Sequence, residues 1–189
     1  GCLLLALQAS SVALGQVDPN WPQWTDPDTS RQYLVDQSTG LGWVFHQRTL
    51  TKAAMVGVLA TGPDSYATHT QVLGLIERFV IDHMGATDTS LSALADLTAD
   101  TTTVDATALG AMLDRLGVPL VNAGAVGFTA TLTSKNCGAQ TGDCNTVVVR
   151  ADRSGTVSLG YLGSTATIPE IPELSRGHWL ARELDRDAD

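Results

Sequence analysis

Residues 31–46, RQYLVDQSTGLGWVFH, contain two runs of strand-forming residues separated by the turn-forming sequence Gln-Ser-Thr-Gly. This pattern predicts a β-hairpin. Residues 49–60 follow at once, and after Lys52 they are entirely apolar or small. A helix of that composition must be covered on several sides, so we expect it to be buried. The fold is therefore expected to grow from a hairpin and one central helix.

The rest of the chain divides into a helical part and a strand-rich part. Helical patterns are predicted at about residues 66–84, 90–97 and 104–116. The last of these helices is expected to be capped by Thr102 or Thr103 and ended by Gly117. An antiparallel three-strand meander is predicted over residues 126–134, 145–152 and 156–163. A last amphipathic helix is expected at residues 174–184.

Together these elements predict a mixed α/β fold of the α+β kind. One antiparallel sheet would combine the N-terminal hairpin with the C-terminal meander, and the buried central helix would pack across its face. A reduced helical lobe would span about residues 63–122, within a single globular domain over residues 31–185 that leaves 186–189 as a tail. With 189 residues and 43% hydrophobic composition, the chain can form the core of one such domain.

The N-terminal residues 1–15, GCLLLALQASSVALG, form an apolar run that ends in small residues, as a signal peptide does. We interpret it as a signal-peptide remnant or, if Cys2 is lipidated, as a lipoprotein leader. Only the lipidated form would be attached to a membrane, because the run is shorter than the about 20 residues of a spanning helix. Residues 16–30 are expected to be a linker or an extended strap held by Trp21 and Trp24. We therefore expect a secreted, periplasmic or cell-envelope protein.

Charge and composition exclude some partners. The net charge is −9 and there is no run rich in Lys or Arg, which argues against nucleic acid. The four histidines have no paired ligand spacing, so we expect no metal site, and no pattern indicates a cofactor. The Asp-rich residues 18–28 lack the acidic twelfth position of a calcium loop and are interpreted as a solvated loop.

The start of the predicted central helix places a hydroxyl and an amine on one face. Thr49 and Lys52 are three positions apart, so the amine could remove the hydroxyl proton if burial lowers the pKa of Lys52. The N-terminus of a helix would then supply donors for an oxyanion. The alternative is structural: Thr49 caps the helix and Lys52 extends to water.

The hairpin followed by residues 49–52, TLTK, and later by residues 140–142, QTG, resembles the penicillin-recognising serine hydrolases. These are the serine β-lactamases, the DD-peptidases and their non-catalytic relatives, in which S-x-x-K opens a buried helix and K-T-G lies on a strand. The resemblance implies a β-lactamase/transpeptidase-like fold with Thr49 as nucleophile and Lys52 as base. It also implies a cell-wall peptide or a β-lactam-like molecule as ligand, contacted by Gln140, Thr141 and Gly142.

Departures from the family pattern predict a weak or inactive site. The nucleophile position carries Thr49, whose extra methyl group crowds an approaching carbonyl carbon, and Gln140 replaces the cationic Lys of K-T-G. A second function therefore stays open beside the first. The alternative is a non-enzymatic envelope or pilus-associated structural or assembly protein with a disulfide-closed antiparallel sheet, because a hairpin, helices and a meander occur in many folds.

Cys137 and Cys144 flank the Gly-rich sequence GAQTGD, and in an exported protein they are expected to form a disulfide. The bond would close a small ring and stabilise the fold by about 2 kcal/mol, mainly by restricting the unfolded chain. Thiol labelling of denatured, unreduced protein should modify neither cysteine. Labelling of both would contradict the disulfide and the exported location together.

Overall fold

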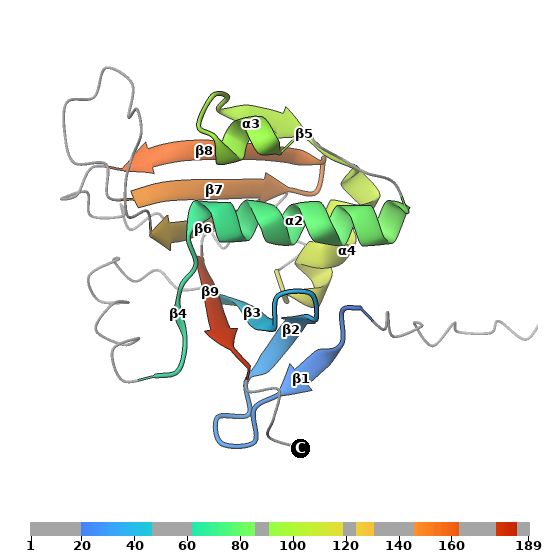
Figure 1. The fold of residues 1–189 in the computed structure, drawn as a ribbon, viewed down its shortest axis with the longest axis vertical. Coiled ribbons are helices and arrows are strands. Elements are labelled where there is room, and N and C mark those ends of the chain that lie inside the picture. Colours follow the sequence, from blue (N-terminus) through green and yellow to red (C-terminus); the bar gives the residue numbers. More distant parts are fainter. Residues whose placement is uncertain are drawn as a thin grey trace, which may run out of the picture.

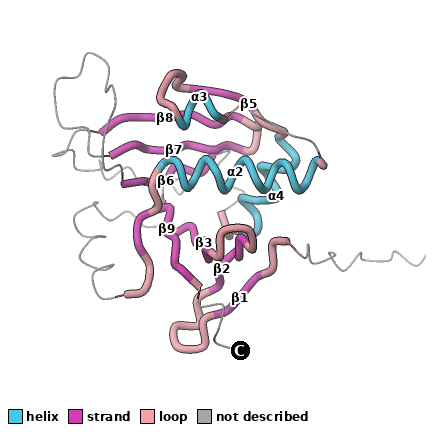
Figure 2. Tube along the Cα trace, in the orientation of Figure 1, coloured by secondary structure: helices cyan, strands magenta, loops and turns pink. Residues whose placement is uncertain are grey.

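The computed structural model describes residues 20–46, 62–85, 91–118, 124–130, 146–162 and 177–184. The helix expected from Thr49 lies outside these residues. The described strands fall into two antiparallel sheets accompanied by helices (Figures 1 and 2). This arrangement confirms a mixed α+β fold.

The first sheet, sheet A, has the strand order β1-β2-β3-β9-β4. Its strands are β1 (Gln23–Thr25), β2 (Gln32–Asp36), β3 (Leu41–His46), β4 (Ser65–Tyr66) and β9 (His178–Glu183). Strands β2 and β3 pair antiparallel with Leu34 opposite Trp43, which confirms the predicted hairpin. The turn closes at Gly40, whose φ of 76° lies in the left-handed region that glycine adopts at low cost.

The second sheet, sheet B, has the strand order β5-β8-β7-β6. Its strands are β5 (Thr101–Thr103), β6 (Gly124–Ala130), β7 (Thr146–Asp152) and β8 (Thr156–Leu162). Strands β6, β7 and β8 form the predicted antiparallel meander. Strand β5 was not expected from the sequence and adds an edge strand beside β8.

The expectation of one sheet shared by hairpin and meander is wrong. The expected C-terminal helix is also wrong, because residues 178–183 form strand β9. Strand β9 pairs with β3 along its whole length, from Leu41 opposite Glu183 to His46 opposite His178. Strand β9 therefore extends the sheet of the hairpin, and the meander lies in the other sheet.

Three helices are described: α2 (His69–Met84), α3 (Ser92–Ala95) and α4 (Ala106–Arg115). Each lies within a predicted helical segment, with shorter bounds. The first begins at a capping box in which Thr68 and Gln71 satisfy each other's backbone N–H groups. Helix α4 is capped by Asp105, not by the expected Thr102 or Thr103, because those threonines belong to strand β5.

The main core lies between sheet B, the helices and one face of sheet A. Helix α2 runs beside β7 and packs on α4 (Figure 1). Trp179 of β9 is fully buried, and its indole N–H donates to the carbonyl of Val149 on β7 at 3.1 Å. Phe45 meets the same indole edge-on, with ring centroids 5.2 Å apart. Trp179 thus joins the two sheets.

Alternation along the strands is confirmed in sheet B and differs in sheet A. Val147, Val149 and Val157 are buried in the core, as their spacing predicts. In β3, Val44 is only half-buried, and its neighbours Trp43 and Phe45 face the core. The larger aromatic side chains bury more apolar area, which favours this face of the strand.

The segment expected to be a linker or strap, residues 16–30, is described from residue 20 and contains strand β1. Trp21 is buried and packs against Phe79 of α2, with the ring planes tilted by 54° and the ring centroids 5.1 Å apart. Its indole N–H donates to the Asp82 carboxylate at 2.8 Å. Strand β1 follows directly and pairs with β2. The tryptophan therefore anchors this segment to α2, as the sequence suggested.

Replacing Trp179 by Phe should weaken the junction of the two sheets. The change removes the donor to Val149 and leaves a void in a fully buried position, so we expect unfolding to become easier by about 1–3 kcal/mol. Trp24→Phe, on the half-exposed edge strand, is the matched control and should cost less than about 1 kcal/mol. Urea denaturation measures both, and equal losses would contradict the role given to Trp179.

Candidate functional site

The residues that the sequence analysis singled out lie outside the described part of the chain. These are the pair Thr49 and Lys52, the segment Gln140, Thr141 and Gly142, and the cysteines Cys137 and Cys144. Their convergence into one site, and the disulfide, stay predictions. A candidate site must therefore be sought among the described ionisable side chains.

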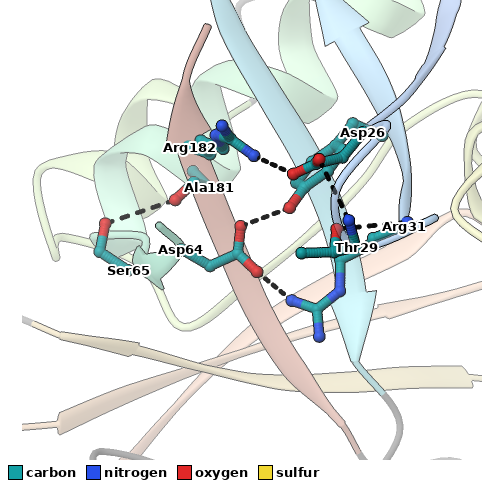
Figure 3. Close-up of polar contacts among 8 residues, drawn as sticks. Asp26, Thr29, Arg31, Asp64, Ser65, Ala181 and Arg182 are labelled. Atoms are coloured by element: carbon teal, nitrogen blue, oxygen red, sulfur yellow. Dashed lines mark hydrogen bonds and ion pairs between the residues drawn. The ribbon is translucent and has the colours of Figure 1, made fainter. Parts of the chain in front are cut away.

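Such side chains gather on the face of sheet A that is turned away from the main core. We call Asp26, Arg31, Tyr33, Asp64 and Arg182 the sheet A polar cluster (Figure 3). Its members come from strands β2 and β9 and from the segments next to β1, β2 and β4. Residues remote in sequence thus meet on one sheet surface.

Asp64 connects the N-terminal hairpin to the start of β4. Its side chain is 2% exposed, and its carboxylate pairs with the Arg31 guanidinium and accepts a 2.7 Å hydrogen bond from the Tyr33 hydroxyl. Burial of Tyr33, together with the neighbouring Asp64 charge, raises the pKa of its phenol. The phenol therefore keeps its proton at neutral pH and acts as a donor, not as a nucleophile.

Asp26 uses its two carboxylate oxygens for different purposes. One accepts the backbone N–H groups of Asp28 and Thr29, which closes the turn between β1 and β2. The other pairs with Arg182 on β9, whose guanidinium lies 5.3 Å from the centre of the Trp24 ring. Burial alone would raise the pKa of Asp26, but these hydrogen bonds outweigh it and lower the pKa.

Asp36 repeats the same design at the hairpin turn. One oxygen accepts the N–H and the hydroxyl of Ser38, at 3.0 and 2.6 Å, and the N–H of Thr39. The other accepts from Nε of Arg78 at 2.8 Å and from a terminal guanidinium nitrogen at 2.6 Å, which ties sheet A to α2. Burial would raise the pKa of Asp36, but the turn donors and the Arg78 charge lower it below 3.8.

A local sequence pattern could have indicated which aspartates close turns. Asp26, Asp36 and Asp152 begin the similar stretches DPDTS, DQSTG and DRSGT, and each closes a turn through its side chain. The arginine partners carry no such signal, because they lie on elements far away in sequence. Asp26 is moreover buried, which corrects the interpretation of residues 18–28 as a wholly solvated loop.

Two histidines occupy paired backbone positions that sequence spacing did not indicate. His46 and His178 occupy directly opposite register positions on β3 and β9. His178 is buried and its Nδ1 lies 2.7 Å from the Tyr66 hydroxyl, where burial raises the pKa of the phenol. In the described ranges, no group of three or more His, Cys, Asp or Glu side chains is arranged to hold a metal ion.

His69, the first residue of α2, is a further buried titratable group. Its Nε2 lies 3.4 Å from the carbonyl of Ala95. Burial lowers the pKa of the imidazole below 6.5, although the hydrogen bond to Ala95 opposes the shift. His69 is therefore neutral at physiological pH and packs α2 against the segment of α3.

The sheet A polar cluster and the separate pair of Asp36 with Arg78 both hold distant parts of the chain together. Asp26, Asp36 and Asp64, the buried carboxylates of the described residues, are each paired with an arginine from another part of the chain. The lowered pKa values of Asp26 and Asp36 make these two carboxyl groups poor general acids, and the engaged lone pairs of all three carboxylates make them poor bases. The cluster joins β1, β2, β4 and β9.

Comparisons with protein-family models, with curated proteins and with solved structures found no match. Function must therefore be argued from the chain itself.

Replacing Asp36 by Asn tests the pair of Asp36 with Arg78 through its dependence on pH. At pH 7 the variant should lose about 2–3 kcal/mol of unfolding free energy, because Arg78 loses its counter-charge. The folded-state pKa of Asp36 is lowered, so its contribution is complete above the unfolded-state value and is lost as the pH falls through the folded-state value. The difference between wild type and variant should therefore shrink as the pH falls below 3.8.

Urea denaturation between pH 7 and pH 2 measures this difference. Asp152→Asn is the matched control, because Asp152 closes a similar turn through Ser154 and Thr156 and has no arginine partner among the described ion pairs. A constant difference for Asp36→Asn across the whole range would show that the arginine pair contributes nothing.

Proposed function

We propose that this chain is an exported cell-envelope domain that binds or assembles and does not catalyse. The observation that carries the proposal is the pairing of Asp26, Asp36 and Asp64 with arginines. Buried carboxylates are the usual source of perturbed acids and bases in active sites. In this protein the three buried carboxylates form ion pairs that hold turns and strands together.

Export is supported by the apolar residues 1–15 and by the expected disulfide of Cys137 and Cys144. In the described part of the chain, no helix is long and apolar enough to cross a membrane. The proposed location is the periplasm, the cell envelope or the exterior.

A β-lactamase/transpeptidase-like fold loses support from the sheet arrangement. That resemblance requires hairpin and meander in one sheet, whereas β9 separates them into two. Its remaining basis is the sequence around Thr49, Lys52 and Gln140–Gly142. A non-enzymatic envelope or pilus-associated role fits the described contacts better, and a cell-wall component is the proposed partner.

Purified protein should show little or no acyl transfer. Incubation with a fluorescent penicillin should leave no covalent label, and a chromogenic cephalosporin should not be hydrolysed above background. Two physical reasons support this expectation: the side chain of Thr49 has one more methyl group than serine, and Gln140 has no positive charge. The loss of one electrostatic contact alone costs roughly a hundredfold in rate. A serine β-lactamase processed in parallel is the positive control. Labelling that disappears in Thr49→Ala and Lys52→Ala would overturn the proposal.

A further inference from the structure

The outer face of sheet B carries an open row of polar side chains. Thr101 on β5 is opposite Ser158 on β8, and Ser158 is opposite Arg150 on β7. Directly paired residues point to the same side of a sheet, and the alternating residues Val149 and Val157 face the core. Thr101 and Arg150 are exposed and Ser158 is half-exposed.

Arg150 differs from the other arginines of the described ranges. Arg31, Arg78, Arg153 and Arg182 each pair with an aspartate. Arg115 donates to the carbonyl of Trp21 and covers the Phe79 ring. For Arg150 no such partner is found in the described part of the chain, and none of the hydrogen bonds found there uses the side chains of Thr101 or Ser158.

Gly160 on β8 determines how Arg150 lies. A Cβ placed on Gly160 would meet three atoms of the guanidinium at nearly equal distances, 3.4, 3.5 and 3.7 Å. A planar group at such even distances presents its flat side to the strand, so its N–H edge stays open to solvent. Because Gly160 has no side chain, the Arg150 guanidinium can lie against the backbone of β8 at this position.

The limits of this surface are set by its neighbours on β7. Val148 faces the same side and is buried, so the open part begins at Arg150. Asp152 also faces this side, and one of its carboxylate oxygens accepts the N–H groups of Ser154 and Thr156 in the turn. The row from β5 to β7 spans roughly 10 Å, twice the spacing of neighbouring strands.

We propose that Thr101, Ser158 and Arg150 form a binding surface for a carboxylate-bearing glycan. A guanidinium with an open N–H edge binds a carboxylate through two parallel hydrogen bonds, and the adjacent hydroxyls donate to and accept from sugar hydroxyls. A flat face suits an extended polymer better than a compact molecule. Because the chain has a net charge of −9, attraction is confined to Arg150, so we expect the contact to be weak. This inference rests on the proposed binding function.

Affinity electrophoresis of the full chain in gels containing polygalacturonate or neutral dextran tests the surface. Polygalacturonate should retard the wild-type protein and dextran should not. Arg150→Gln should weaken retardation about tenfold or more, since it removes the charge-assisted contact. Gly160→Val should weaken it several-fold while keeping the charge, because the new side chain displaces the guanidinium. Val favours strands, so this variant is expected to fold.

The hydroxyl contacts are tested by Thr101→Ala, with Thr25→Ala on the exposed edge strand β1 as the matched control. Only the first should weaken retardation, and thermal melting verifies that each variant is folded. Equal retardation by dextran, no retardation of the wild type, or retention that persists in Arg150→Gln would overturn the glycan site. If the glycan site is overturned but penicillin still does not label the protein, the proposed non-catalytic function stands. Labelling by penicillin would overturn that function whatever the gels show.

Discussion

The burial of Trp179 between the two sheets is the constraint on which the rest of the arrangement depends. Its indole N–H reaches the carbonyl of Val149 on β7, and its ring meets Phe45 on β3. A buried donor left without a partner is costly, so this hydrogen bond fixes where β9 lies relative to sheet B. Since β9 also pairs with β3 and β4, both of its neighbours in sheet A are positioned by the same side chain.

Three aspartates extend this framework to the turns and to α2. Asp26 and Asp36 each close a turn with one oxygen and hold a distant arginine with the other, and Asp64 joins Arg31 to Tyr33. The turn hydrogen bonds are local, whereas the arginines come from α2, β9 and the start of β2. Local turn formation thus also prepares the binding partner for a long-range ion pair, which favours one arrangement over its alternatives.

The two outer sheet surfaces consequently have different characters. On sheet A the charged side chains neutralise one another and the aromatic rings of Trp24 and Tyr33 cover the Arg182 guanidinium. On sheet B, Arg150 rests on Gly160 beside unengaged hydroxyls. Only the second surface offers a charge and hydrogen-bonding groups that the described structure does not already use, which favours binding there.

The sequence by itself determined the elements whose signals are local. The hairpin follows from strand formers around residues 37–40, the meander from alternating valines, and α2 from its apolar face and its capping residues. The turn role of Asp36 could likewise be predicted from its neighbours. These features depend on residues within a few positions of one another, so their physical causes are visible in the chain.

Only the tertiary structure decided which strands became neighbours and which polar groups met. Residues 178–183 carry a pattern compatible with an amphipathic helix, yet pairing with β3 and burial of Trp179 make them a strand, which places the meander in a second sheet. The row of Thr101, Ser158 and Arg150 likewise exists only through the register of three strands. Backbone pairing and burial between distant segments contribute more free energy than the local preference of a short segment, and that energy has no signature in any one stretch of sequence.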